Sequence, residues 1–188
     1  MSSQSCGSRP GLLPGENCGL MSHFARTAGA VDISLTTRNF DHIDSARLLR
    51  AYAVERREVV GFDDLPDLDK PFEFAPPCGR FVVVYSAVGE PIACGGFRTY
   101  PERDAVVEVR KMYVDPRHRR LGLGSLVLAA LEKHAAEQGA HEVILETGSY
   151  NRVATRMYES AGYHLIPAYV PGRPDFNRAY SKTLSPLD

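Results

Sequence analysis

The chain contains no tryptophan, few cysteines and no long apolar run. Its four cysteines (Cys6, Cys18, Cys78 and Cys94) form no C-x-x-C pair, so their spacing fits neither a zinc site nor a dense disulfide framework. We interpret them as reduced thiols of a cytoplasmic protein that holds no metal ion, and we expect Cys94 to pack as a small apolar residue. Because no apolar run approaches the roughly 20 residues of a membrane span, we expect no membrane association.

The chain also lacks an excess of charge of either sign. Its 22 Lys and Arg residues and 23 Asp and Glu residues give a net charge of −1. Such a chain has no global field that favours nucleic acid or an anionic membrane surface. A basic cluster does occupy residues 110–120, but Tyr113 is the only aromatic ring within it on which a base could stack. We therefore expect no nucleic-acid partner.

The N-terminal residues differ in composition from the rest. Residues 1–29 are small, polar and rich in Gly and Pro, and they contain no apolar core of the kind that a signal peptide needs. We predict a disordered leader there, with Met21 as an alternative start to Met1. Residues 30–188 are enough for one domain with a proper core and not clearly enough for two.

From residue 31 onward, the hydrophobic pattern predicts a regular order of strands and helices. The expected strands cover residues 31–36, 80–86, 91–100, 105–114, 141–147, 163–169 and 178–183. The expected helices cover residues 40–60, 126–138 and about 152–161. Asp41 or Asp44 is the expected N-cap of the first helix, and Asn151 that of the third. The three strands from 80 to 114 follow one another directly, which indicates an antiparallel meander.

The most specific pattern is the glycine-rich turn from Arg119 to Ser125, which follows a strand and opens a helix. Such a turn offers unpaired backbone N–H groups and the positive end of a helix dipole, which together suit a phosphate. Gly122 and Gly124 allow close approach to the backbone, and Arg119 and Arg120 can add charge-assisted hydrogen bonds. The turn lacks the Gly-Lys-Ser/Thr of a Walker loop and the third glycine of a dinucleotide fingerprint.

Two elements about thirty residues apart resemble the GCN5-related N-acetyltransferase (GNAT) superfamily. They consist of Arg119, Gly122 and Gly124, then Asn151, Ala154, Met157, Tyr158, Gly162 and Tyr163. The likeness covers about residues 31–184. It implies an α/β (α+β) architecture, the acyl-CoA N-acyltransferase fold, in which helices flank a mixed, mostly antiparallel central sheet. It also implies that residues 30–188 form a single N-acetyltransferase domain with acetyl-CoA as co-substrate.

The resemblance further implies where the cofactor lies. The pyrophosphate of coenzyme A is expected against the amides of the glycine turn. The pantetheine arm is expected beside the preceding strand, which such folds splay from its neighbour at a bulge, and an amide there can stabilise the oxyanion of the tetrahedral intermediate. The expected cofactor-binding residues are Met112, Tyr113, Val114, Arg119, Arg120, Leu121, Gly122, Leu123, Gly124, Ser125 and Asn151.

Two catalytic residues follow from the same resemblance. Tyr158 matches the tyrosine near the sulfur, which donates a proton to the departing thiolate, although it could simply pack on the buried face of its helix. Glu108 is the candidate base, acting directly or through water. Arg110 lies two residues on and would hold this carboxylate ionised, so gripping the substrate's ammonium and pairing with Arg110 stay open as alternative roles.

The implied function is transfer of an acetyl group from acetyl-CoA to a primary amine of a small molecule or amino acid, by direct attack through a tetrahedral intermediate. A non-catalytic acyl-CoA-binding sensor is the alternative. Five acidic residues near the expected acceptor pocket favour a cationic acceptor. These residues are Asp63, Asp64, Asp67, Asp69 and Glu73. A homodimer is compatible with the sequence, which does not determine the oligomeric state.

Overall fold

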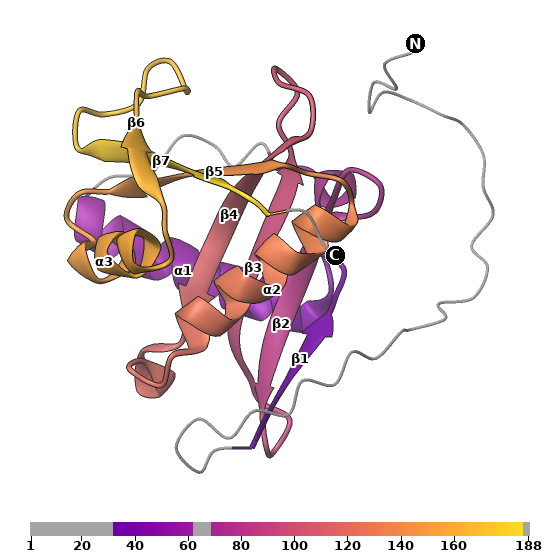
Figure 1. Cartoon of the computed structure of the whole chain (residues 1–188). Helices are drawn as coiled ribbons and strands as arrows, with labels where there is room; N and C mark the ends of the chain where they lie inside the picture. The colour runs from indigo at the N-terminus through magenta and orange to yellow at the C-terminus, as the bar shows by residue number, and fades with distance from the viewer. Residues whose placement is uncertain (1–31, 62–68, 186–188) are drawn as a thin grey trace.

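The computed structural model describes residues 32–61 and 69–185, so the predicted leader lies outside the described residues. Its centre is a seven-stranded sheet in the order β1-β2-β3-β4-β5-β7-β6 (Figure 1). The strands are β1 Ile33–Thr37, β2 Gly79–Ser86, β3 Pro91–Thr99, β4 Val106–Val114, β5 Glu142–Gly148, β6 His164–Ile166 and β7 Asn177–Thr183. Every neighbouring pair is antiparallel except β4 and β5, which are parallel. The predicted mixed, mostly antiparallel sheet is confirmed.

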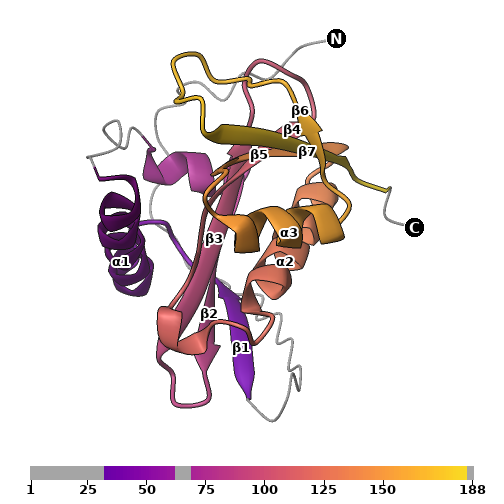
Figure 2. The ribbon, with the colours of Figure 1, turned by 90° about the vertical axis from the view of Figure 1, so that its left-hand side faces the viewer.

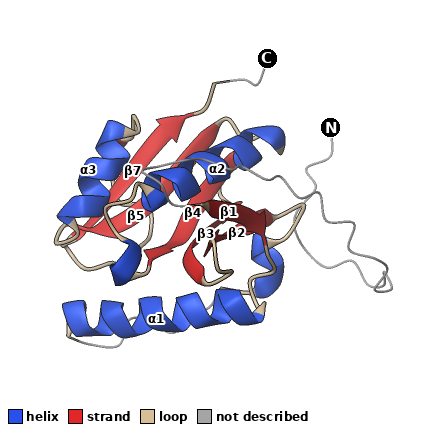
Figure 3. Ribbon diagram, turned by 90° about the horizontal axis from the view of Figure 1, so that it is seen from below, coloured by secondary structure: helices blue, strands red, loops and turns tan. Residues whose placement is uncertain are grey.

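Helices cover both faces of this sheet, as predicted. The α-helices are α1 Ile43–Val60, α2 Leu123–Glu137 and α3 Arg152–Ser160, and two short 3₁₀ helices are η1 Pro71–Phe74 and η2 Pro116–His118. Figure 2 shows α1 on one side of the sheet and both α2 and α3 on the other, and Figure 3 shows the same layers from below. Since β4 and β5 are parallel, they need a crossover between them, and α2 supplies it.

The core divides along the two faces of the sheet. Strand β2 is buried on both faces, so its side chains alternate between the two halves of the core. Val82 and Val84 pack with α2 and α3, whereas Phe81 and Val83 pack with Leu48 of α1. The α1 half is rich in aromatic rings and contains Cys94, which is fully buried, so the prediction that this thiol packs as an apolar residue is confirmed.

Several details differ from the sequence-based expectation. Helix α1 is capped by His42, whose Nδ1 accepts from the Asp44 N–H at 3.2 Å, rather than by Asp41 or Asp44. The strand expected at 163–169 is limited to His164–Ile166, since Pro167 follows and has no N–H for the ladder. Cys78 is disulfide-bonded, which corrects the prediction of a reduced thiol at that position.

Gly79 at the start of β2 provides a test of this packing. A Cβ there would lie 2.2 Å from both the Glu73 and the Phe97 carbonyl oxygens, which are backbone atoms and cannot move aside. We expect Gly79→Ala to lower the free energy of unfolding by about 3 kcal/mol or more. The control is Gly89→Ala, where a Cβ meets nothing within 4 Å and only the positive φ of 78° opposes the change, at about 1 kcal/mol. Urea titrations that show the same loss of unfolding free energy in Gly79→Ala and Gly89→Ala would contradict this account.

Candidate functional site

The sheet opens between β4 and β5. Pairing between these strands runs only from Val106 opposite Glu142 to Val109 opposite Leu145. Beyond that point β5 continues to pair with β7 as far as Gly148, while β4 continues to Val114 along β3. The described strands therefore form a V, with both arms held by their outer neighbours.

A bulge in β4 accompanies this opening. The register with β3 shifts between Gly96 opposite Arg110 and Cys94 opposite Tyr113, so two residues of β4 face a single residue of β3. Lys111, within the bulge, has a positive φ of 58°. The structure thus contains the splayed, bulged strand that the resemblance implies, with Met112, Tyr113 and Val114 on its free arm.

The glycine turn lies at the end of that arm. Arg120 and Gly122 have φ values of 65° and 75°, a backbone conformation that turns successive N–H groups toward a common concavity. The first hydrogen bond of α2 joins the Leu126 N–H to the Gly122 oxygen at 3.0 Å. The N–H groups of Leu123, Gly124 and Ser125 precede this ladder, and a helix N-terminus of this kind suits an anion.

Gly124 explains why the two sequence elements occur together. A Cβ at this position would lie 2.9 Å from the Met157 Sδ of α3, so glycine allows α2 and α3 to approach closely. Gly122, by contrast, has nothing within 4 Å of its missing Cβ, which leaves space beside the turn for a ligand. Asn151 caps α3 as predicted, its Oδ1 accepting from the Ala154 N–H at 3.2 Å.

The two arginines of the turn differ in their surroundings. Arg119 donates to the Val114 carbonyl oxygen at 3.0 Å and to Glu55 of α1 at 2.7 Å, so its charge is shared with that carboxylate. Arg120 and Leu121 are exposed, while Leu123 turns its side chain into the core. Both arginines are exposed, and Arg120 is the one whose charge is not shared with Glu55.

Tyr158 is buried in α3, with 5% of its surface exposed, and its ring packs against Tyr163 and Tyr180 at centroid distances of 5.8 and 6.2 Å. Burial raises the pKa of the phenol, and Tyr52 adds a smaller contribution in the same direction. Tyr52 belongs to α1, which lies on the opposite side of the sheet from α3 (Figure 2). The raised pKa of Tyr158 keeps its phenol protonated, as a proton donor must be.

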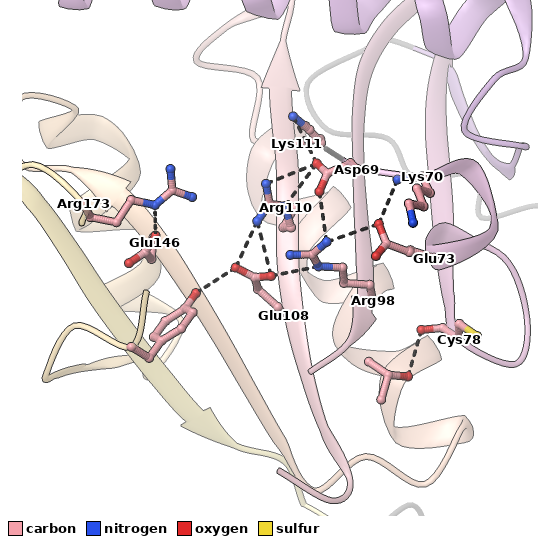
Figure 4. Close-up of polar contacts among 12 residues, drawn as sticks. Asp69, Lys70, Glu73, Cys78, Arg98, Glu108, Arg110, Lys111, Glu146 and Arg173 are labelled. Carbon is pink, nitrogen blue, oxygen red and sulfur yellow. Dashed lines mark hydrogen bonds and ion pairs between the residues drawn. The ribbon is translucent and has the colours of Figure 1, made fainter. Parts of the chain in front are cut away.

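Glu108 lies at the base of the opening, with 3% of its surface exposed. Its oxygens accept hydrogen bonds from Arg98 Nε at 3.0 Å, Arg110 Nη1 at 3.3 Å and the Tyr169 hydroxyl at 3.1 Å (Figure 4). Pairing with Arg110, one of the three roles left open by the sequence, is present. Both oxygens of this carboxylate already accept hydrogen bonds from two guanidinium groups and a phenol, which leaves little room for a substrate's ammonium.

Asp69, one of the five acidic residues expected near the acceptor pocket, belongs to the same network. Its side chain is only 2% exposed and bonds to Arg98 at 3.1 Å, Arg110 at 3.2 Å and Lys111 at 3.2 Å. Glu73 accepts from Arg98 at 3.2 Å. The negative charges of Asp69 and Glu73 are thus balanced by neighbouring cations. The other three residues expected to make this region acidic, at 63, 64 and 67, lie outside the described residues.

Glu146 on β5 is a buried carboxylate that sequence reasoning missed. Its side chain is 9% exposed, and Arg173 Nε donates to its Oε2 at 2.9 Å (Figure 4). The other oxygen, Oε1, is buried and has no hydrogen-bond partner among the described residues. Burial raises the pKa of this carboxyl; Arg173 lowers it, and Glu108 contributes a further increase. The signal in the sequence was an acidic residue directly after the three apolar residues 143–145 of the strand.

Within residues 32–61 and 69–185, no three His, Cys, Asp or Glu side chains are grouped so that they could hold a metal ion. No helix in these ranges combines the length and the apolar character needed to span a bilayer.

Comparison with known proteins places the chain in a family. The model of the acetyltransferase (GNAT) family matches residues 45–163. An uncharacterized N-acetyltransferase from Schizosaccharomyces pombe is 25% identical over 141 residues, which cover 74% of the chain and 86% of that protein. An IAA acetyltransferase from Azospirillum brasilense is 30% identical over 101 residues, covering 54% of the chain and 65% of that protein. Other curated relatives match over only 27% of their own length.

The solved structures agree with this result. A Klebsiella pneumoniae protein assigned as an acyl-CoA N-acyltransferase shares 27% sequence identity and superposes with a TM-score of 0.67, covering 81% of the chain and 98% of that structure. The sheet order and the opening between β4 and β5 are consistent with the family that the sequence model matches. The chain therefore belongs to the acetyltransferase (GNAT) family, a family of acyltransferases.

Proposed function

We propose that this protein transfers an acetyl group from acetyl-CoA to a primary amine of a small molecule. The observation that carries the proposal is the opening of the sheet at Val109 and Leu145, immediately before a strand arm that leads to the glycine turn. The name of the Azospirillum relative, IAA acetyltransferase, supports a small-molecule acceptor. Release of free thiol from acetyl-CoA, measured with a panel of amines, tests it.

In this proposal the glycine turn holds the diphosphate of acetyl-CoA. The amides of residues 120–125 converge on one concavity, and the open space beside Gly122 admits the phosphates. The free arm of β4, from Met112 to Val114, lines the pantetheine, whose amides take the place of the missing strand partner. Asn151 is a further cofactor-binding residue of this proposal, and it also caps α3 at its N-terminus.

The chemistry needs a proton donor, an oxyanion donor and an accessible amine. The amine attacks the thioester carbonyl carbon, and a β4 amide near Met112–Val114 stabilises the oxyanion of the tetrahedral intermediate. Tyr158 then gives its proton to the sulfur as the carbon–sulfur bond breaks, and the nitrogen, which becomes the amide, returns one of its own protons to the phenolate. Glu108 serves as a positioning residue that orders Arg98, Arg110 and Tyr169, since its hydrogen bonds with these groups occupy both carboxylate oxygens.

The alternative function is an acyl-CoA sensor that binds without turnover. Tyr158, a buried phenol in α3 with a raised pKa, favours the enzyme, because a sensor has no use for a proton donor at the sulfur. Binding of acetyl-CoA without thiol release for any amine would favour the sensor. A cytoplasmic location and a homodimer stay predictions.

The phosphate site can be tested at Ser125, an exposed residue in the first turn of α2. A carboxylate there stabilises the helix by about 0.3–1 kcal/mol through its dipole. The same carboxylate repels the diphosphate. We expect Ser125→Glu to keep or raise the melting temperature and to weaken acetyl-CoA binding at least about tenfold, or roughly 1.4 kcal/mol, in calorimetry. Ser125→Ala is the control. Unchanged affinity of Ser125→Glu for acetyl-CoA would show that the phosphates do not bind at this turn.

The proton donor can be tested with a matched pair of tyrosines. We expect Tyr158→Phe to lower kcat by about 10²-fold while acetyl-CoA binding stays within a few-fold. Tyr163→Phe is the control, because Tyr163 is about equally buried and its ring lies 5.8 Å from that of Tyr158. A similar loss of kcat in both variants would assign the effect to packing rather than to proton transfer.

A further inference from the structure

The residues of β5 alternate between the two faces of the sheet, and one of these faces borders the opening. The side chains at 143 and 145 belong to the core that packs against α2 and α3. The opposite face of β5 therefore carries Ile144, Glu146 and Gly148. Because pairing with β4 ends at Leu145, Glu146 and Gly148 lie on the arm of β5 that borders the opening.

The chain between β6 and β7 runs along this face and contacts it at successive points. Tyr169 packs with Ile144 in a small apolar cluster. Arg173 Nε donates to Glu146 Oε2 at 2.9 Å (Figure 4). The carbonyl oxygen of Phe176 accepts an N–H from the turn that follows β5 at 2.7 Å. In order along the strand, this face therefore meets Tyr169, Arg173 and Phe176.

Tyr150 adds a second ring at the far end of this face. A Cβ at Gly148 would lie 2.2 Å from Cε1 and 2.5 Å from Cζ of Tyr150, so this ring occupies the space that a side chain at 148 would need. The Phe176 ring lies 5.6 Å from it at an interplanar angle of 58°. Tyr150 nevertheless keeps 43% of its surface exposed. The glycine and the phenylalanine thus hold an aromatic ring beside the opening, with part of its surface available for contact.

Glu146 supplies a polar point beside this ring. Its Oε1 is buried, and within residues 32–61 and 69–185 it has no hydrogen-bond partner. A buried acceptor of this kind is stabilised by a ligand that brings an N–H donor. Residues two apart on a strand are separated by roughly 7 Å. A donor at Glu146 and a ring at Gly148 therefore fit a ligand in which a short carbon chain joins an amine to an apolar group.

We propose that Tyr150 is a specificity-determining residue whose ring packs against an aromatic ring of the acceptor. This inference rests on the proposed function and names the acceptor as an aryl-alkyl amine, in which a short carbon chain joins a primary amine to an aromatic ring. Two aromatic rings gain from edge-to-face or offset contact in addition to burial. A polyamine would instead bring further ammonium groups close to the guanidinium of Arg173, and like charges at short range repel.

The test compares Tyr150→Ala and Tyr150→Phe with the control Leu165→Ala. Leu165 is an exposed apolar residue of β6, which β7 separates from β5. Thiol release is measured with 3-phenylpropylamine, propylamine and putrescine. We expect the parent protein to favour 3-phenylpropylamine at least about tenfold in kcat/KM, and Tyr150→Ala to lose about that factor through a higher KM for this amine. Propylamine changes less than about twofold in Tyr150→Ala. Tyr150→Phe and Leu165→Ala stay close to the parent protein.

A second variant moves the ring without removing it. The atoms that a Cβ at Gly148 would meet belong to the end of the Tyr150 side chain, which can swing away. We expect Gly148→Ala to show the same selective loss with 3-phenylpropylamine as Tyr150→Ala. Because both changes act through one ring, the double variant loses no more than Tyr150→Ala alone. Additive losses would show that Gly148 does not act by seating this ring.

The outcomes separate this inference from the proposed function. A parent protein that favours putrescine, equal losses of Tyr150→Ala with both monoamines, or a raised KM for acetyl-CoA alone would each overturn the role of Tyr150, while the acetyltransferase function stands.

Binding without turnover gives an independent readout. Calorimetry measures the affinity for 3-phenylpropylamine of protein saturated with coenzyme A, and we expect Tyr150→Ala to bind it about tenfold more weakly than the parent protein. If the parent protein releases no thiol with any amine, the proposed function fails, and this difference in affinity still supports the aromatic contact. Equal affinities, or no binding to the parent protein, would overturn it.

Discussion

The loss of hydrogen bonding between β4 and β5 is the constraint on which the rest of the structure depends. Two parallel strands would normally stay paired to their ends, but the bulge at Lys111 redirects β4 after its pair at Val109. The arms do not collapse onto each other because β3 and β7 hold them apart. The unpaired backbone groups of the β4 arm then need a partner, and an extended ligand with amides of its own can supply one.

An opened sheet exposes polar groups in the middle of a domain, and the ion-pair network lines that region. Asp69 joins Arg98, Arg110 and Lys111, and Arg98 also reaches Glu108. Removing such charges from water is costly, and the cost is offset only when each carboxylate meets several donors in good geometry. The network thus joins the chain before η1 to β3 and β4 and orders the acceptor side of the opening.

Local patterns predicted most of the fold and the glycine turn before α2, because strand alternation, helix spacing and glycine placement depend on neighbours a few residues away. Gly122 and Asn151 are examples, as both act within their own turn or cap. The contacts of the acceptor side are different. Tyr169 reaches Glu108 across 61 residues of sequence, and Asp69 reaches Arg110 across 41. No spacing rule shows such pairs, so the ion pairs of Glu146 and Asp69 were visible only in the folded chain.

The opening also lies between groups that belong to opposite faces of the sheet. The glycine turn and Tyr158 belong to the side of α2 and α3, whereas Glu108 packs on the side of α1 with η1. The close approach at Gly124 sets α2 against Met157, the residue next to Tyr158. The pairing of β4 with β5 ends at Val109 and Leu145, so beyond these residues no ladder separates the two faces. The separation of the strands is therefore the feature that makes one site accessible to both faces.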